Sequence, residues 1–421
     1  MSFFTTLEKP KVNRMWRYEL QKIFSRTGGK LALLVLAIGL AVICYAATLH
    51  VSFTDENGDD HTGPAAAREL QALKDEWAGP IDQAMLLRAA EANQRVITSA
   101  DYNSTDIQRQ NAAYHDTQGY ETIRSLIAQT YDGFNEYNYY RINTLTSEEA
   151  GQLYERRTEN LETWLAQPEN TFSPAERQYL ISHYEAMETP LINAYNDGWE
   201  AILYYMPTLV LFFVFLIVFL VSGIFPCERR WKSDAIFFST IRGRTSAVRA
   251  KIVCGIVTVT GLYWLTIAVY SLVLLALLGA EGADGALQLL RLKAFYNITI
   301  GQTYILAVLG GYIGVLFLSL VAMLVSALSG SQVAGVIVPY VIVLAANFAK
   351  SILSDWENLP DFLGLLPDQL LSLYQVMNDF NLYSIFGHIT GAVPILFLLY
   401  SLLSLLLLPL LYRIYRKSQV R

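Results

Sequence analysis

Charged residues are scarce in this chain. They make up 16% of its 421 positions, against 53% hydrophobic residues, whereas about 25% of the residues in a typical soluble domain are charged. Charge is almost missing from six segments, each of about 20 residues or more, the length that a helix needs to cross the hydrocarbon of a bilayer. These segments are residues 31–50, 201–225, 252–279, 303–329, 332–353 and 392–411. The sequence therefore predicts an all-α polytopic membrane protein with six transmembrane helices.

Cysteine and clustered histidine are also scarce. The three cysteines stand at positions 44, 227 and 254, and none lies between residues 51 and 198. That polar segment must therefore be held together by a packed core and not by disulfides. The five histidines show no His-x-x-x-His spacing, and the sequence has no Gly-x-x-x-x-Gly-Lys-Ser/Thr phosphate loop. We therefore expect no metal site, no catalytic residues, and no cofactor bound by this chain itself.

The charge that the chain does carry is distributed unevenly. Residues 1–30 hold seven Lys or Arg, residues 226–251 hold seven more, and the tail after residue 411 holds four. Because six helices cross alternately, these three segments share one side, which the positive-inside rule makes the cytoplasm. Residues 51–198 hold 25 acidic and 10 basic residues and are predicted to lie outside. Their acidity would steer cationic ligands, or would serve solubility alone.

These rules predict the order of segments along the chain. A cytoplasmic N-terminus (1–30) precedes the first transmembrane helix (31–50), and an extracellular helical domain (51–198) separates it from the second helix (199–225). The remaining segments are a cytoplasmic loop (226–251), transmembrane helices three to five (252–353), short extracellular interfacial or re-entrant helices (354–391), and the sixth helix with a basic cytoplasmic tail (392–421). The expected location is a plasma membrane, with both termini cytoplasmic, and the lack of disulfides suggests a bacterial protein.

Helix signals dominate the outer domain. Thr146 followed by Glu149 has the spacing of a capping box and predicts a helix to about Gln167, and Ser173 followed by Glu176 predicts a second helix. Aromatic residues crowd the preceding segment, where they form core or, alternatively, a surface for peptide or lipid. These aromatics are Tyr131, Phe134, Tyr137, Tyr139 and Tyr140.

Apolar residues recur at helical spacing just before the first span. Basic residues lie largely between them, which predicts a short amphipathic helix in the inner headgroup layer, with an incidental basic segment as the alternative. Gly28 and Gly29 permit a bend into the bilayer. The apolar residues of this interfacial helix are Trp16, Leu20, Ile23 and Phe24.

A few unusual residues lie within the predicted spans. Lys350 and Asn347 stand near the outer end of the fifth span. There Lys350 reaches water by snorkelling or, alternatively, takes part in a proton-coupled site. Small residues permit close helix contact, either within the chain or at a dimer seam. They are Gly310, Gly311, Gly314 and Gly335.

The cytoplasmic loop 226–251 contains the most informative pattern. Asp234 to Thr240 can form a short helix with a bulky apolar face at residues 236–238, ended by Gly243 and followed by basic residues. Exposed apolar side chains on such a loop require a protein partner or the bilayer surface.

This loop resembles the coupling region of permease subunits in the type-2 ABC exporter family. The family pattern is a Glu, a Gly about four residues later, a Leu-rich turn, Ser-Thr-Pro, then Gly-Arg or Ser-Arg, and a Lys seven residues later. Lys232 stands where the family often has Gly, and Ile241 where it often has Pro. The N-terminal amphipathic helix, the six spans and the short outer helices also resemble the family. The resemblance assigns ATPase coupling to Glu228, Asp234, Ile236, Phe237, Phe238, Ser239, Thr240, Gly243, Arg244 and Lys251.

The resemblance implies an ATP-driven transporter. The chain would be a permease that exports a peptide, antibiotic, lipid or ion, and it would pair with a separate ABC ATPase subunit and with a second permease, identical or different. ATP and Mg²⁺ would be bound by that ATPase, and no nucleic acid is expected as a partner. The alternative is a membrane-anchored sensor or scaffold whose acidic outer domain binds a ligand.

Overall fold

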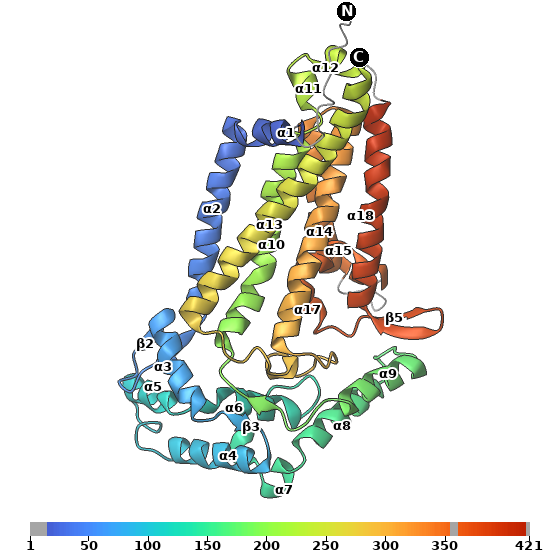
Figure 1. Cartoon of the computed structure of the whole chain (residues 1–421). Coiled ribbons are helices and arrows are strands. Elements are labelled where there is room, and N and C mark those ends of the chain that lie inside the picture. The colour runs from blue at the N-terminus through green and yellow to red at the C-terminus, as the bar shows by residue number, and fades with distance from the viewer. Residues whose placement is uncertain (1–14, 354–360, 418–421) are drawn as a thin grey trace, which may run out of the picture.

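The computed structural model describes residues 15–353 and 361–417, and most of them are helical. Figure 1 shows a bundle of long helices above a layer of shorter ones, with α1 and the end of α18 at the far end of the bundle. Within the described ranges, five helical segments are long and apolar enough to cross a membrane. They are Thr27–Thr48 (α2), Asp197–Ser222 (α10), Gly243–Leu278 (η4 and α13), Ile300–Ser329 (α14) and Ala392–Arg416 (α18). The sequence prediction of a helical membrane protein is therefore confirmed.

The predicted fifth span corresponds to α15 (Gln332–Leu353). Its described apolar part, Gln332–Ala346, is shorter than the five segments above. α15 packs against α10 and α14, and the hydroxyl of Tyr340 donates a hydrogen bond to a carbonyl of α10. The side chains of Asn347 and Lys350 lie outside the described residues.

The helices α10 and α14 form the centre of the bundle, and α2, α13 and α18 pack around them. The hydroxyl of Tyr263 on α13 donates to the carbonyl of Val308 on α14 at 2.7 Å, which satisfies a polar group that lipid cannot. A Cβ added to any of the four span glycines noted in the sequence would meet an atom of this same chain. These glycines therefore serve close packing within the chain.

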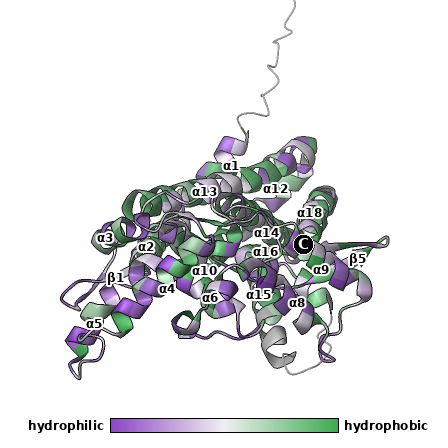
Figure 2. Ribbon diagram, turned by 90° about the horizontal axis from the view of Figure 1, so that it is seen from below, coloured by the Kyte–Doolittle hydropathy of each residue, from purple (hydrophilic) through white to green (hydrophobic). Residues whose placement is uncertain are grey.

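The layer below the bundle is formed by residues between α2 and α10. Its amphipathic helices mix hydrophilic and hydrophobic colours in Figure 2, and two small antiparallel sheets, which the sequence did not predict, join them. The helices are α3 (Pro64–Asp75), α4 (Gln83–Ile97), α5 (Ile107–His115), α6 (Glu121–Thr130), α7 (Ser147–Ala150), α8 (Leu153–Leu165) and α9 (Pro174–Glu185). The strands are β1 (Ser52–Thr54) with β2 (Asp60–Thr62), and β3 (Gly79–Pro80) with β4 (Ile192–Asn193).

Both predicted capping boxes are present, at Thr146 and at Ser173. The helix predicted from Thr146 to about Gln167 is wrong as a single element. The first helix ends after one turn at Gly151, its C-cap, and a new helix begins at Leu153; glycine is a poor helix former.

The preference for aromatic core in this layer is correct only in part. Phe134 stacks on Trp164 at a centroid distance of 4.7 Å, and Tyr131 donates a hydrogen bond to the Glu149 carbonyl. The other three aromatics are exposed, since the fully buried positions of this core are filled by residues such as Tyr120, Ile123 and Leu126. The exposed three are Tyr137, Tyr139 and Tyr140.

Polar contacts fasten this layer to the bundle. Lys74 of α3 forms an ion pair with Asp197 at the start of α10, with Nζ and Oδ1 2.7 Å apart. The buried guanidinium of Arg157 on α8 donates to the carbonyls of Leu292 and Ala294, in the connection between α13 and α14. The layer is therefore held to two separate parts of the bundle.

The segment before α18 contains short helices, as the sequence predicted, and they are followed by an antiparallel hairpin that the sequence did not predict. Leu370 and Leu373 are buried against α14, which makes this segment part of the bundle core. The elements are η6 (Asp361–Leu365), α16 (Asp368–Leu371), α17 (Leu373–Val376), β5 (Leu382–Ile385) and β6 (His388–Gly391); residues 354–360 lie outside the described part.

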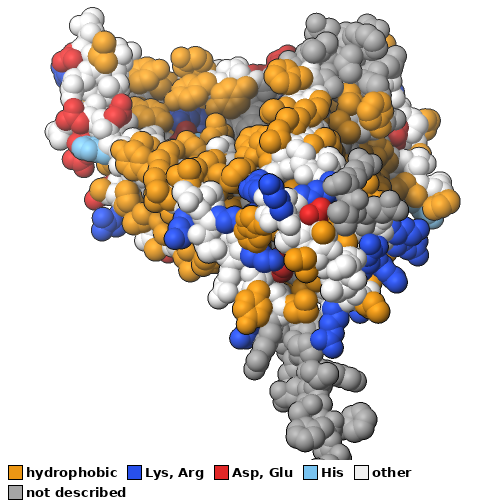
Figure 3. Space-filling view, turned by 90° about the horizontal axis from the view of Figure 1, so that it is seen from above, with side chains coloured by type: hydrophobic (Ala, Val, Ile, Leu, Met, Phe, Trp, Pro, Cys, Tyr) orange, Lys and Arg blue, Asp and Glu red, His pale blue; other side chains and the backbone are white. Residues whose placement is uncertain are grey.

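Three short elements cover the end of the bundle where α18 ends: α1 (Met15–Phe24), α11 (Cys227–Arg230) and α12 (Asp234–Ser239). The helix predicted around Trp16 to Phe24 is confirmed as α1. At the bend into α2, a Cβ on Gly29 would collide with the carbonyl oxygen of Ile23, so glycine is required there. Figure 3 shows Lys and Arg side chains spread over this end of the molecule.

Candidate functional site

The short helix α12 lies where the sequence pattern predicted it. The Ser233 carbonyl accepts the amide of Phe237 at 2.9 Å, which closes the first helical turn, and Thr240 ends the helix with extended backbone. The preceding residue, Lys232, has φ +55°, a left-handed conformation that favours glycine. The Ser233 hydroxyl donates to Oε2 of Glu228 at 2.9 Å, which ties α12 to α11.

Two of the three bulky residues of α12 face the bundle. Phe238 is 3% exposed, and its ring lies 5.4 Å from that of Tyr415 on α18. Phe237 is half-buried, at 6.1 Å from the same ring. Tyr415 in turn donates to the carbonyl of Phe225 at 3.0 Å. The expectation that residues 236–238 form one exposed apolar face is therefore wrong for the two phenylalanines, because the end of α18 supplies an aromatic surface for them.

The opposite face of α12 is open. Ile236 is 74% exposed and Ile241, just after the helix, is 84% exposed. The hydroxyl groups between them do not make this face polar, because Ser239 and Thr240 donate their hydroxyls to carbonyls of their own turn. Isoleucine side chains so exposed beyond the ends of the membrane helices form an apolar surface suited to a protein partner.

The turn after α12 is held by residues that the family resemblance had singled out. Gly243 donates its amide to Oγ1 of Thr240 at 3.0 Å. Arg244 donates Nε to the carbonyl of Phe238 at 2.5 Å. A Cβ on Gly243 would collide with the carbonyl oxygen of Phe237, so this position also requires glycine. Together these contacts fix α12 relative to the start of α13.

Behind α12 lies a buried ion network. The Nζ of Lys251, which is 0% exposed, lies 2.9 Å from Oε2 of Glu19 and 2.9 Å from Oε1 of Glu228. Lys22 contacts both carboxylates as well, at 2.8 Å and 3.1 Å. Two acids thus balance two lysines, which removes the large penalty of burying unpaired charge. The network joins α1, α11 and α13.

The network perturbs the acidity of its members outside the spans. Burial alone would raise the pKa of Glu228, but the charges of Lys251 and Lys22 outweigh it and lower that pKa to about 2. Burial and the Lys251 charge act to lower the pKa of Lys22, yet the hydrogen bond to Glu19 and the two carboxylate charges raise it above its usual value. Glu228 and Lys22 are therefore both charged near neutral pH.

A metal ion is the other occupant that this cluster suggests. One ligand atom each from Glu19, Cys227 and Glu228 lie within 4.8 Å of one another. Lys251 donates to the thiol of Cys227 at 3.3 Å as well as to both carboxylates. An ion would have to displace this buried ammonium group, so the arrangement fits an ion-pair network.

The structure brings together most of the residues predicted from the loop pattern. Glu228 and Lys251 meet directly, and residues 234–244 form α12 and its turn. The predicted interfacial residues Trp16, Leu20 and Phe24 of α1 are half-buried, and Ile23 is buried. The pattern missed Glu19 and Tyr415, although Glu19 lies between Trp16 and Ile23 on the apolar face of α1, where a carboxylate signals a buried partner.

Comparisons with protein-family models, with curated proteins and with solved structures find no match for this chain.

Proposed function

We propose that the chain is the permease subunit of an ATP-driven transporter of the type-2 ABC exporter kind, and that a separate ATPase docks on α12. One observation carries the proposal. α12 offers exposed Ile236 and Ile241 on one side, while Phe237 and Phe238 engage α18 on the other. A force applied to the outer face therefore reaches a transmembrane helix through packed aromatic rings.

The membrane topology of the proposal has six crossings with both termini in the cytoplasm. α14 ends at the same end of the bundle as α12, and α18 begins at the opposite end (Figure 1), so the chain between them must traverse the bundle once more. α15 has 22 residues, and at 1.5 Å per residue it is about 33 Å long, enough to cross. The acidic layer 51–198 then lies outside, and the basic end in Figure 3 lies inside.

ATP binding can be coupled to movement of the spans only if the ATPase contacts α12 differently in its two states. Nucleotide binding closes the ATPase dimer, and this moves the spans only as far as one docked arrangement of α12 is favoured over another. The ion network of Lys251 fixes α13 and α1 to the same corner, so α12, α13 and α18 would shift as one unit. A second permease is needed to complete the pathway through which the cargo crosses the membrane. ATP and Mg²⁺ are bound by the ATPase. The cargo is a peptide, antibiotic, lipid or ion.

The left-handed backbone at Lys232 supports the family resemblance independently. The family often has glycine at this position, and φ +55° is the conformation that glycine adopts without strain. Although Lys232 departs from the family pattern, its backbone has the conformation that the family's glycine would adopt.

The decisive experiment substitutes the exposed face of α12. The chain is expressed with the ATPase encoded beside its gene, and Ile236→Asp is compared with Ile107→Asp, which alters an isoleucine of similar exposure, 71%, in α5. We expect Ile236→Asp to weaken copurification of the ATPase at least about tenfold and to abolish its stimulation, while Ile107→Asp changes neither. Transport or signalling by the isolated chain with no ATPase bound would refute the proposal.

A second candidate function is a membrane-anchored sensor. It is favoured by a cavity of about 590 Å³ in the outer layer, walled by Trp77, Arg95 and His115 among others, which is large enough for a small molecule. A kinase encoded beside the gene, with no lone ATPase, would favour this function over transport.

A further inference from the structure

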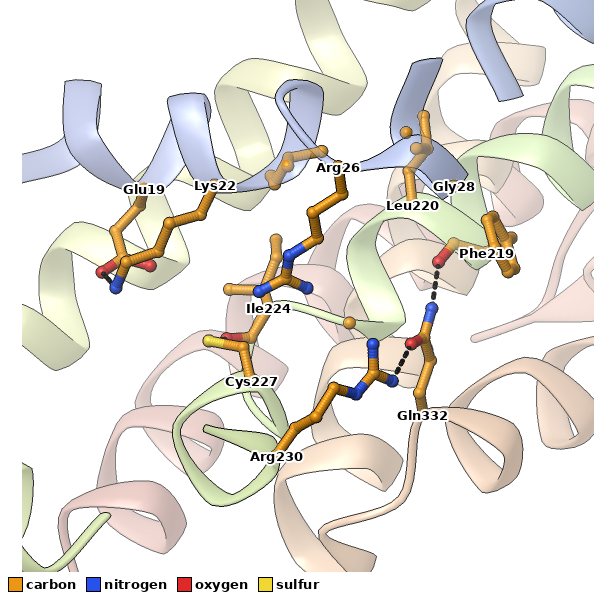
Figure 4. Close-up of a pocket in the computed structure, with 13 residues that line it drawn as sticks. Glu19, Lys22, Arg26, Gly28, Phe219, Leu220, Ile224, Cys227, Arg230 and Gln332 are labelled. Carbon is orange, nitrogen blue, oxygen red and sulfur yellow. Dashed lines mark hydrogen bonds and ion pairs between the residues drawn. The ribbon is translucent and has the colours of Figure 1, made fainter. Parts of the chain in front are cut away.

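A pocket of about 120 Å³ lies between the α1–α2 joint, the end of α10 and the start of α15 (Figure 4). One wall is apolar and contains Phe219, Leu220 and Ile224. The other side contains the basic residues Arg26 and Arg230. The pocket borders the ion network but takes no part in the contacts of α12.

Two guanidinium groups face each other across this pocket (Figure 4). Arg26 lies over the ring of Trp231 at 4.6 Å, and Arg230 donates to Oε1 of Gln332 at 2.6 Å. Neither arginine has an ion pair with a carboxylate within residues 15–353 and 361–417. A guanidinium group over an aromatic ring keeps N–H donors that can bind an acceptor.

The acidic residues nearest the pocket do not neutralise these arginines. Glu19 lines the pocket, but Lys22 and Lys251 occupy its two oxygens at 2.8 Å and 2.9 Å. Glu228 is engaged by the same two lysines. Two cations of like charge therefore face a shared space, an arrangement that an anion between them would stabilise.

The start of α2 borders the same space. Gly28 and Gly29, in the first turn of this 22-residue helix, line the pocket, and its N-cap has no side-chain hydrogen bond. The first amides of a helix have no partner inside it and carry partial positive charge. Two arginines and a helix start together form a site for a phosphate group.

The position of the pocket identifies the source of that phosphate. It lies at the ends of α2 and α10, where both candidate spans leave the hydrocarbon. The adjoining turns carry exposed apolar side chains along which acyl chains can lie. These are Leu31 and Leu34 on α2, Phe219 on α10, and Val333 and Ile337 on α15.

We propose that this pocket binds the phosphate of an anionic phospholipid, held between Arg26 and Arg230 with its acyl chains against the bundle. The proposal does not depend on the transport function, because it concerns lipid binding and its test does not use ATP hydrolysis. It predicts one tightly held lipid in addition to the ordinary lipid shell.

The test uses the full chain in nanodiscs of phosphatidylcholine, with phosphatidylglycerol as the anionic probe and native mass spectrometry to count retained lipid. Arg26→Gln with Arg230→Gln is compared with Arg242→Gln with Arg416→Gln, exposed bases of the same end that do not line the pocket. We expect at least about tenfold weaker phosphatidylglycerol binding in the pocket variant and unchanged binding in the control. Equal losses in both would show a general effect of surface charge and overturn the proposal.

Thermal unfolding of both proteins in phosphatidylcholine alone distinguishes a loss of phosphate binding from a loss of folding. Inorganic phosphate, added without anionic lipid, should raise the melting temperature of the unsubstituted chain more than that of the pocket variant. If phosphate instead displaces phosphatidylglycerol at equal concentration, the site is one for a soluble phosphate and the lipid assignment is overturned. No response to either probe would overturn the site itself.

Discussion

At the scale of single residues, Lys251 connects the parts of the candidate site. It lies in a basic stretch of the chain, yet its ammonium group is fully buried. Glu19, one of the two acids that hold it, is 232 positions away in the sequence. A buried lysine without such partners would lose its charge or unfold its surroundings. The fold at this end therefore depends on α1 docking against α13.

Replacing Lys251 by methionine should destabilise the protein. The change leaves Glu19 and Glu228 buried with only half-exposed Lys22 between them, and breaking a buried pair costs about 3–5 kcal/mol. Thermal unfolding in detergent measures the effect. The triple variant Glu19→Gln, Lys251→Met, Glu228→Gln removes all three charges and should recover most of the loss. A single variant as stable as the unsubstituted chain would show that the network adds nothing.

The pH dependence of stability should carry the signature of Glu228. Its pKa falls from 4.5 to about 2 in the folded protein, so the folded state binds its proton less readily than the unfolded state. The resulting stabilisation is complete above about pH 4.5 and is lost as the pH falls toward 2. We expect the melting temperature of the unsubstituted chain to fall more steeply over this range than that of Glu228→Gln. Parallel curves would contradict the ion pairing.

At the scale of elements, α12 has two faces with different tasks. Its inner face is a packing surface that contacts α18, and its outer face is exposed isoleucine. Local sequence identifies the helix, since Asp234 stands in its first turn and apolar residues follow. It does not identify the faces, because the partner surface is Tyr415, which lies near the other end of the chain.

Truncations on the two faces of α12 should therefore differ. Phe238→Ala removes a ring buried against Tyr415 and should cost about 3–5 kcal/mol, whereas Ile236→Ala at an exposed position should change stability by less than about 0.5 kcal/mol. Release of α12 would also speed trypsin cleavage after exposed Arg242 in the first variant. The melting temperatures and the trypsin cleavage rates of the two variants test this difference. Equal behaviour of both variants would mean that α12 is not anchored through Phe238.

How far elements can be predicted from sequence depends on where their determinants lie. The long helices follow from apolar length, and the capping boxes at Thr146 and Ser173 follow from bonds across three residues. The strand pairs are harder, since β3 joins a β4 that lies about 110 residues later. The helical periodicity of α1 is visible in its sequence, whereas the burial of Glu19 on it depends on Lys251.

At the scale of the whole molecule, the path of the chain and its charge agree. The bundle separates a basic end, with α1, α11 and α12, from a layer that carries a large acidic excess. Five candidate spans alone would leave α1 and the end of α18 on opposite sides, whereas both lie at the basic end (Figure 1). The crossing by α15 that we propose would put both of these elements on one side and would bring the positive-inside rule into agreement with all three basic segments.

Cysteine labelling can test this six-span topology in intact cells. The native cysteines, Cys44, Cys227 and Cys254, are buried, so single serine-to-cysteine changes supply the reactive thiols. Ser182→Cys in α9 and Ser239→Cys in α12 are matched exposed positions at the two ends of the molecule. A membrane-impermeant maleimide should label the first from outside and the second only in inverted vesicles. The reverse order would place the acidic layer inside the cell and α12 outside, and labelling of both positions from one side would place the two ends of the molecule on the same side of the membrane. Either result would contradict the six-span topology.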